Sequence, residues 1–436
     1  MHVILLSGGS GKRLWPLSNE IRSKQFIKIF RREDGTYESM VQRVFRQIRA
    51  VEPNATVTIA TSKSQVSAIH NQLGDAVGIS VEPCRRDTFP AIALASAFLH
   101  DVKGVSAEET VVVCPVDPFV EEDYFEALGR LAELAEAGTA NLTLMGIEPT
   151  GPSEKFGYII PESKEVVSRV STFKEKPSEA VAREYIAQGA LWNGGVFAYR
   201  LGYVLERAHE LIDFTDYQDL YSKYATLRKI SFDYAVVEHE SDIAVMRFAG
   251  VWKDIGTWNT LTEAMSDATL GRAILGDGCE DVHVFNELNL PVLCMGLKGV
   301  VVAASADGIL VSELERSSAI KPYVDSLDQQ VMYAEKSWGH YQVLDVQPGS
   351  LTIKATMEAG HAMNYHSHEH RNEVWTVLSG EGETLIDGMK QAVHPGDVVT
   401  ILAGCRHTVR AVTDLTLIEV QLGENISVHD KKKYEI

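Results

Sequence analysis

A glycine-rich turn directly after a short apolar segment is the feature that most constrains this chain. Residues 3–6 read Val-Ile-Leu-Leu, the length and composition of a buried parallel strand, and residues 7–13 read Ser-Gly-Gly-Ser-Gly-Lys-Arg. Glycines let a backbone approach a ligand closely, and successive N–H groups in such a turn can point at phosphate oxygens. The spacing fits neither the Walker A pattern nor the GxGxxG fingerprint. We therefore expect a strand that ends in a phosphate-binding turn.

Positive charge is concentrated around this turn. The first 32 residues hold one acid, Glu20, and seven basic side chains, which are Lys12, Arg13, Arg22, Lys24, Lys28, Arg31 and Arg32. The whole chain carries 41 basic and 60 acidic residues, a formal net charge of −19. This contrast favours an anionic ligand at the turn, and the alternative is a strand and turn with a solvated basic flank. The overall acidity argues against non-specific nucleic-acid binding.

The length of 436 residues and the changes in the expected pattern of strands and helices along the chain predict three domains. Strands alternate with helices over residues 1–268, which predicts an α/β domain with a Rossmann-like, mixed and mainly parallel sheet. Short β segments over 269–335 predict a small β connector with a scaffolding role, either a β-helix-like or a sandwich unit, and the strands of 336–436 predict a C-terminal β-barrel. No apolar run approaches 18 residues, so no membrane span is expected. Five scattered cysteines and the lack of a cleavable leader favour a reducing cytoplasm.

The turn and the residues after it resemble a known family. Residues 7–18 and 23–26 (Ser-Lys-Gln-Phe) look like the signature of sugar-1-phosphate nucleotidyltransferases, specifically mannose-1-phosphate guanylyltransferases. The resemblance implies that the turn holds GTP, and that Arg13 and Lys24 neutralise phosphates during transfer to mannose 1-phosphate. The nucleotide-binding residues that it implies in this part of the chain are Leu6, Ser7, Gly8, Gly9, Gly11 and Lys12.

A second segment, residues 81–91, opens an alanine-rich helix that runs through His100. From the residues alone, this is a capped helix start, with Asp87 or Thr88 as the cap. The resemblance implies a further role, because the family uses a similar segment beside the base and ribose of the nucleotide. On that reading the nucleotide contacts are Glu82, Arg86 and Thr88.

Two aspartates are candidate metal ligands. Asp117 follows the β-branched strand 110–114, and the carboxyl ends of strands are where open α/β sheets place their ligands. Asp254 lies in Trp252-Lys-Asp-Ile-Gly-Thr-Trp258, which resembles a closing motif of the family. The resemblance implies that both carboxylates bind one Mg²⁺, which would bridge nucleotide and sugar phosphates. The alternatives are a turn or helix cap at Asp117 and a tight turn at Asp254.

Three segments resemble the sugar-binding elements of the family. Residues 173–177 (Phe-Lys-Glu-Lys-Pro) imply that Glu175 bonds sugar hydroxyls and that Lys176 pairs with the sugar phosphate. A charged surface strand is the alternative for this segment. Residues 191–197 resemble a sugar-binding turn with Asn193 and Gly195, although Gly194 stands where many relatives carry serine. Residues 230–238 resemble a segment that frames the pocket. Gly157 would let the backbone pack close to the sugar ring.

The C-terminal segment carries a metal-binding pattern. Gly360-x5-His366-x-His368-x4-Glu373-x6-Gly380 reproduces the first cupin motif, and residues 396–407 reproduce most of the second, with Leu402 in place of the usual proline. Alternation along a strand sends His366 and His368 into one small barrel, where Glu373 and His407 would join them. Zn²⁺, Fe²⁺, Mn²⁺ and Co²⁺ all suit such a set. A metal-free cupin that keeps these residues for packing is the alternative.

The same domain resembles the phosphomannose isomerase domain that is often fused to these guanylyltransferases. The resemblance rests on residues 336–340, Lys354 and residues 370–375, but His366 replaces a glutamine and Val374 replaces a histidine of that pattern. Isomerisation of mannose 6-phosphate is therefore left open, as is a homodimer. The resulting prediction is a Mg²⁺-dependent enzyme that forms GDP-mannose and pyrophosphate without a covalent intermediate. The alternatives are a cupin that carries the main activity beside a degenerate transferase domain, or transfer to another hexose 1-phosphate or from another base.

Overall fold

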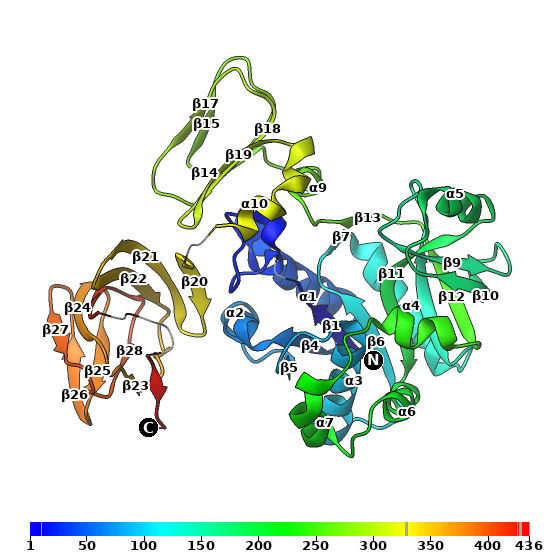
Figure 1. The fold of residues 1–436 in the computed structure, drawn as a ribbon, viewed down its shortest axis with the longest axis horizontal. Helices are drawn as coiled ribbons and strands as arrows, with labels where there is room; N and C mark the ends of the chain where they lie inside the picture. Colours follow the sequence, from blue (N-terminus) through cyan, green and yellow to red (C-terminus); the bar gives the residue numbers. More distant parts are fainter. Residues whose placement is uncertain (10, 328–329, 425, 427–429, 436) are drawn as a thin grey trace. The chain divides into compact units, whose positions relative to one another are not determined.

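The computed structural model describes residues 1–9, 11–327, 330–424, 426 and 430–435 (Figure 1). These residues form two compact units. The first unit contains Met1–Gly9, Lys24–Val66 and Leu73–Ser266, and the second contains Ser10–Ser23, Ser67–Gln72 and Asp267–Ile436. The predicted division of the C-terminal part into a connector and a barrel falls inside the second unit and stays a prediction. In the described residues, no helix combines the length and apolar character needed to cross a membrane.

A nine-stranded mixed sheet forms the centre of the first unit, in the order β5-β4-β1-β6-β11-β8-β12-β10-β9. β1 pairs in parallel with β4 and β6, and all strands except β10 and β11 run in the same direction. This confirms the prediction of a mixed, mainly parallel sheet. The strands are β1 His2–Ser7, β4 Thr56–Ser62, β5 Gly78–Glu82, β6 Thr110–Pro115, β8 Leu142–Ile147, β9 Gly157–Pro161, β10 Val167–Lys174, β11 Leu191–Arg200 and β12 Ile243–Phe248.

Helices cover this sheet, and their sequences explain where they begin and what they bury. α1 begins at a capping box formed by Ser39 and Gln42, and α3 is apolar on all sides because it is buried. Residues of β1 and β6, among them Ile4 and Val111, share one core with Ile92 of α3. The helices are α1 Met40–Val51, α3 Thr88–Ala97, α4 Glu122–Glu136, α5 Glu179–Ala187, α6 Leu201–Leu211, α7 Tyr217–Lys223, α8 Phe232–Ala235 and α9 Trp258–Thr262.

The N-terminal 268 residues also form two small two-stranded sheets and one further helix. One sheet pairs β2 with β3, and the other pairs β7 with β13. Most of α2 belongs to the second unit. These elements are β2 Lys28–Arg31, β3 Tyr37–Ser39, β7 Pro118–Val120, β13 Trp252–Asp254 and α2 Val66–Leu73.

Short parallel strands follow in the second unit. β14 pairs in parallel with β16, β16 with β18, and β15 with β17, as expected for a β-helix-like coil. Val282, Val284, Cys294 and Val302 form the core of this coil. The elements are β14 Thr269–Gly271, β15 Ala273–Leu275, β16 Glu280–Asn286, β17 Val292–Cys294, β18 Lys298–Ser305, β19 Gly308–Glu313 and α10 Lys321–Asp325.

Two antiparallel sheets follow in the second unit, and their strand orders are β20-β21-β22-β29-β24-β27 and β26-β25-β28-β23-β30. Their apolar inner faces share one core, which includes Met357, Trp375, Val409 and Leu417. The strands are β20 Tyr333–Lys336, β21 Gly339–Gln347, β22 Ser350–Met357, β23 His366–Ser367, β24 Asn372–Ser379, β25 Gly382–Ile386, β26 Met389–Val393, β27 Val398–Ile401, β28 His407–Ala411, β29 Leu415–Leu422 and β30 Lys432–Lys433.

Candidate active site and metal centre

The two predicted Mg²⁺ ligands lie together at the carboxyl end of β6. Asp117 lies two residues after the end of β6, and Asp254 ends β13, whose antiparallel register places it opposite Pro118. Lys24 reaches both carboxylates, because its Nζ lies 2.8 Å from Oδ2 of Asp117 and 3.8 Å from Oδ1 of Asp254. Lys24 also donates a hydrogen bond to the Ile255 carbonyl at 2.8 Å. One cation therefore already contacts both acids, so the pair has the spacing to share a divalent ion.

The glycine-rich turn begins at the same edge of the sheet. Leu6 pairs with Pro115 across the β1–β6 ladder, and Gly9 has a φ of +98° that favours glycine. Ser7 is buried in a polar cluster, where it donates to Gln65 at 3.0 Å and accepts from Gln25 at 2.9 Å. Nothing lies within 4 Å of where a side chain at Gly8 would begin. The backbone of the turn is therefore accessible at Gly8, and hydrogen bonds fix the position of Ser7 where the turn begins.

The remaining turn residues belong to the second unit, and Ser10 of the signature lies outside the described residues. Gly11 has a φ of +62°, and its carbonyl accepts a hydrogen bond from Ser18 at 2.6 Å. Lys12 forms an ion pair with Asp325 of α10 at 2.8 Å, and Arg13 is exposed. The phosphate-neutralising role of Arg13 stays a prediction.

The segment predicted to contact the base and ribose has intramolecular partners. Glu82 accepts a hydrogen bond from the Tyr224 hydroxyl at 2.7 Å, and burial raises the pKa of the Glu82 carboxyl. Arg86 donates to the Ala225 carbonyl. Asp87 caps α3 through the Thr88 N–H at 2.9 Å, and the Thr88 hydroxyl accepts from the Phe232 N–H at 2.8 Å. Asp87 and Thr88 therefore have structural roles in the fold. The nucleotide contacts of Glu82, Arg86 and Thr88 stay predictions.

The predicted sugar-binding residues converge at the junction of β9, β10 and β11. Gly157 lies opposite Asn193 in the β9–β11 pairing, and a Cβ atom on Gly157 would lie 2.5 Å from Oε2 of the buried Glu175. Lys176, whose φ is +45°, places its Nζ 2.6 Å from Oε1 of Glu175. Burial lowers the pKa of Lys176, but the hydrogen bond and charge of Glu175 outweigh that effect and raise it. Asn193 is buried, and its Oδ1 accepts from the Gly195 N–H at 3.1 Å.

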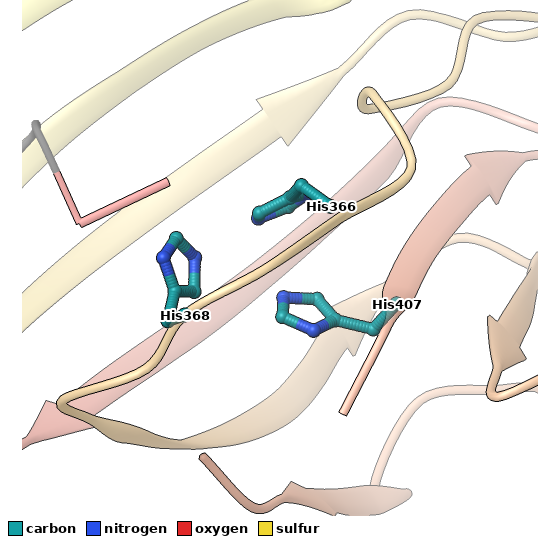
Figure 2. Close-up of side chains that lie close together, drawn as sticks. All are labelled: His366, His368 and His407. Carbon is teal, nitrogen blue, oxygen red and sulfur yellow. The ribbon is translucent and has the colours of Figure 1, made fainter. Parts of the chain in front are cut away.

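Three buried histidines come together inside the barrel, and Figure 2 shows their rings facing one another. Each of His366, His368 and His407 offers one ligand atom, and these atoms lie within 4.8 Å of one another. Every Nδ1 contacts a carbonyl oxygen: His366 that of Asn364 at 2.6 Å, His407 that of Cys405 at 3.0 Å, and His368 that of Asp430. A carbonyl can only accept, so Nδ1 carries the proton and each Nε2 bears the lone pair that a metal would take.

Glu373 completes this set. Its two oxygens lie 3.1 Å from Nε2 of His368 and 3.3 Å from Nε2 of His407, and only 1% of the residue is exposed. Burial raises the pKa of the Glu373 carboxyl, but His368 and His407 outweigh that effect and lower it. In the described part of the chain, the buried Nε2 of His407 has no well-aligned hydrogen-bond partner. Three imidazoles and one carboxylate therefore fit a divalent transition metal.

Some residues of the barrel interior were not predicted from the sequence. Arg371 lies 3.2 Å from Glu373 and 3.0 Å from Nε2 of His368. Glu419 of β29 is buried on the same inner face as Glu373, because the β24–β29 register pairs it with Trp375. Burial raises the pKa of Glu419 to about 8, and the charge of Glu373 acts in the same direction. Leu415, Leu417 and Glu419 are alternate residues of β29, so all three face the barrel interior. This alternation is the sequence feature that could have identified Glu419 as an interior residue.

Asp233 of α8 lies in the predicted sugar-binding region but was not predicted from the sequence as a site residue. Its Oδ1 accepts a hydrogen bond from Asn193 at 2.6 Å. Burial raises the pKa of the Asp233 carboxyl to about 6, and the negative charge of Glu175 acts in the same direction. The segment 230–238 resembles a pocket-framing element, but the sequence alone does not bring this carboxyl to Asn193.

Comparison with known proteins agrees with this geometry. A nucleotidyl transferase family model matches residues 2–270, and a cupin domain model matches residues 353–420. The xanthan biosynthesis protein XanB of Xanthomonas campestris pv. campestris strain B100 is 29% identical over 99% of this chain and 97% of its own length. The mannose-1-phosphate guanylyltransferase of Escherichia coli K12 is 28% identical over 100% of this chain and 98% of its own.

A solved structure is similar over three quarters of this chain. The crystal structure of mannose-1-phosphate geranyltransferase from Thermus thermophilus has a TM-score of 0.62 and 29% identity, and the match covers 75% of this chain and 99% of that one. The family model alone spans more than half of the 436 residues. The chain belongs to the nucleotidyl transferase family and is a nucleotidyltransferase.

Proposed function

We propose that this enzyme is a mannose-1-phosphate guanylyltransferase, which forms GDP-mannose and pyrophosphate from GTP and mannose 1-phosphate. The observation that carries the proposal is the contact of Lys24 with both Asp117 and Asp254. Full-length relatives that bear this name, such as the Escherichia coli protein, support the choice of substrates. Five cysteines without a disulfide in the described residues are consistent with work in the cytoplasm.

The reaction needs positioning and charge neutralisation from the protein. A phosphate oxygen of mannose 1-phosphate attacks the α-phosphorus of GTP, the new P–O bond forms, and the bond to pyrophosphate breaks. Lys24 supplies fixed positive charge at the two acids, and Lys176 supplies it beside Glu175 in the sugar-binding region. Asp117 and Asp254 would hold Mg²⁺, which supplies charge stabilisation to the reacting phosphates when bound. Arg13 and Lys12 would act on the triphosphate.

A substrate panel tests this proposal. The full chain is incubated with Mg²⁺, each of four nucleoside triphosphates and several hexose 1-phosphates, and pyrophosphate and sugar nucleotide are measured together. We expect GTP with mannose 1-phosphate to give the highest kcat/KM. A higher kcat/KM with another base or sugar would reassign the substrate, and no pyrophosphate release with any pair would contradict the proposal.

A second activity, isomerisation of mannose 6-phosphate in the cupin, is favoured by lysines beside the histidine cluster. Burial lowers the pKa of His366 to about 2, and the positive charge of the nearby Lys431 acts in the same direction. Lys433 lies opposite His366 in the antiparallel β23–β30 pairing, and burial together with the charge of Lys433 lowers the pKa of Lys336. A cluster of cations next to a metal-binding set suits a phosphorylated sugar.

This second proposal has its own test. The full chain is stripped with a chelator, loaded separately with Zn²⁺, Mn²⁺, Co²⁺ or Fe²⁺, and assayed for conversion of mannose 6-phosphate to fructose 6-phosphate. We expect conversion with at least one metal and its loss on His407→Ala. If none of the four metals supports conversion, the isomerase proposal is wrong. The transferase proposal does not depend on this result.

A further inference from the structure

We infer that the C-terminal segment 430–434 belongs to the metal centre of the barrel, and that Asp430 is a positioning residue that fixes the metal ligand His368. Neither proposed activity is required for this role, because it concerns how the chain holds its metal. The starting point is a difference among the three imidazoles, since the ring of His368 contacts a residue 62 positions away along the chain.

The three histidine rings are oriented in two ways. Through Nδ1, His366 and His407 each contact the carbonyl of the residue two positions earlier. Nδ1 of His368 instead donates to the carbonyl of Asp430. A metal-bound imidazole uses its second nitrogen in this way, and the partner fixes both the tautomer and the direction of the ring. His368 therefore depends on the C-terminal segment for its orientation.

The carboxylate of Asp430 holds the backbone that follows His368. Its Oδ1 accepts from the Glu369 N–H at 2.9 Å, and its Oδ2 accepts from the His370 N–H at 3.2 Å. The carbonyl of His368 accepts from the Gly404 N–H at 2.7 Å. Asp430 thus fixes the ring of His368 through its own carbonyl and the next two residues through its side chain.

Strand β30 supports the strand that carries His366. In the antiparallel β23–β30 pairing, Lys433 lies opposite His366 and Lys432 lies opposite Ser367. β23 is only two residues long, and on its other side His366 pairs with His407 of β28. β30 therefore gives this short strand its second neighbour in the sheet.

Tyr434 fixes the far end of the segment. Its N–H donates to the Tyr365 carbonyl at 2.8 Å, and its hydroxyl shares a hydrogen bond of 3.0 Å with the hydroxyl of Ser367. The guanidinium carbon of Arg406 lies 4.3 Å from the centroid of the Tyr434 ring, a cation–π contact. Both ends of the segment are therefore bonded to residues 365–370, the stretch that carries two of the histidines.

These contacts lie outside the part of the chain that carries the cupin pattern. The cupin domain model matches residues 353–420, and the two motifs span residues 360–380 and 396–407. Asp430 belongs to neither, although it provides the partner of a motif histidine. The motif residues alone would leave Nδ1 of His368 without the acceptor that orients it.

The segment contributes less to the core of the barrel than to the metal centre. Among the described residues, the buried apolar cluster of the barrel includes Trp375 and Leu417 but none of residues 430–434. Loss of the Asp430 contacts should therefore weaken metal binding while the barrel stays folded.

The test measures metal affinity in the full chain. Metal-free wild type, Asp430→Ala and Asp430→Asn are titrated with Zn²⁺ by calorimetry in excess Mg²⁺, which prefers oxygen ligands. Loss of a partner that orients a metal ligand typically costs about 10- to 100-fold in metal affinity, so we expect the Kd for Zn²⁺ to rise by that factor in Asp430→Ala. Asp430→Asn keeps an oxygen that can accept from one N–H, so it should recover part of the loss.

A spectroscopic measurement distinguishes positioning from stability. The absorption spectrum of the Co²⁺-loaded barrel depends on the geometry of the ligands, so it should differ between Asp430→Ala and wild type. The unfolding temperature of the metal-free proteins should stay nearly the same.

Asp397→Ala is the matched control. Asp397 is a partly exposed acid of the same barrel whose carboxylate also accepts from a backbone N–H, that of His394 at 2.8 Å. Its Kd for Zn²⁺ should match that of wild type. Tyr434→Ala is a second variant, which releases the far end of the segment and should raise the Kd several-fold. If Asp430→Ala fails to fold, Tyr434→Ala decides.

Three results would overturn the role of Asp430. One is a Kd for Zn²⁺ that stays within about threefold of wild type in Asp430→Ala, and another is an equal rise in Asp397→Ala. The third is a lower unfolding temperature of metal-free Asp430→Ala with an unchanged Co²⁺ spectrum, which would indicate a merely structural role. Absence of Zn²⁺ binding in wild type would exclude the metal centre together with this role. The transferase proposal is independent of all these results, because pyrophosphate release tests it.

Discussion

Arg22 and Glu287, which are 265 positions apart in the sequence, form a two-point ion pair in the second unit. The guanidinium nitrogens lie 2.8 and 2.9 Å from the two carboxylate oxygens, and Arg22 also lies over the Tyr333 ring at 4.9 Å. Burial lowers the pKa of Arg22, but Glu287 more than compensates and raises it. The N-terminal segment that carries Lys12 and Arg13 is therefore anchored to the β-helix-like coil.

Other contacts anchor the same segment. Ser305 donates to the Pro16 carbonyl at 2.7 Å, and Asn19 donates to Asp307 at 2.8 Å. At Gly308 a Cβ atom would lie 2.4 Å from Cζ2 of Trp15. The connector, which we expect to be a scaffold, therefore contacts the segment that follows the predicted phosphate-binding turn.

Glu287→Gln should loosen this anchor, since it removes the carboxylate that forms the two-point ion pair with the buried Arg22. We expect a loss of roughly 2 to 4 kcal/mol in the stability of the second unit, together with a several-fold rise in the KM for GTP. Thermal unfolding and steady-state kinetics measure the two effects. Glu280→Gln is the control, because the Glu280–Lys298 pair is exposed and such pairs contribute little. Equal behaviour of the two variants would refute the anchoring role.

Removing a histidine of the barrel should abolish metal binding there. His407→Ala takes away one of three clustered imidazoles, so we expect the affinity for Zn²⁺ to fall by more than about 100-fold. Metal content per chain and calorimetric titration measure this loss. His361→Ala, at an exposed histidine of the same domain, should bind as the wild type does. Transferase activity should be unchanged in both variants, and undiminished Zn²⁺ affinity in His407→Ala would exclude the cluster.

Asp233→Asn should change how stability depends on pH. Because the folded protein raises the pKa of Asp233 to about 6 from an unfolded value of 3.8, the native state holds this proton more tightly. The corresponding stability is present at low pH and is lost as pH rises toward 6. We therefore expect the unfolding temperature of Asp233→Asn, relative to wild type, to be higher at pH 7.5 than at pH 4.5. No change in that difference between the two pH values would contradict the shift.

Lys24→Gln should slow turnover without removing either acid. Lys24 is the one described cation that an ion pair joins to both Asp117 and Asp254, and loss of a preorganised charge of this kind typically costs about 100- to 1,000-fold in kcat. Lys28→Gln, at an exposed lysine four residues away, is the control. A kcat within threefold of wild type for Lys24→Gln would remove it from the chemistry.

The sequence predicted the parts of the site whose geometry is local. His366 and His368 alternate on one short stretch, so periodicity places them on one face, and Asp117 lies two residues after the end of a β-branched strand, where open sheets place their ligands. The mixed, mainly parallel sheet follows from the alternation of strands and helices in the same way.

Long-range partners could not be predicted. Nothing in residues 230–238 shows that Asp233 meets Asn193, and nothing near Arg22 identifies Glu287 as its partner. Both contacts depend on how distant segments pack, which a single sequence does not encode locally. Thr88 illustrates the same limit, because its hydroxyl fits a nucleotide contact from the motif but bonds the Phe232 N–H in the fold.

The most direct test of the central claim is Mg²⁺-dependent pyrophosphate release from GTP and mannose 1-phosphate by wild type, Asp117→Asn and the exposed control Asp213→Asn. If Asp117 and Asp254 hold the ion together, Asp117→Asn should be at least about 100-fold slower with an unchanged unfolding temperature, and Asp213→Asn should match the wild type. A wild-type rate for Asp117→Asn would contradict the account.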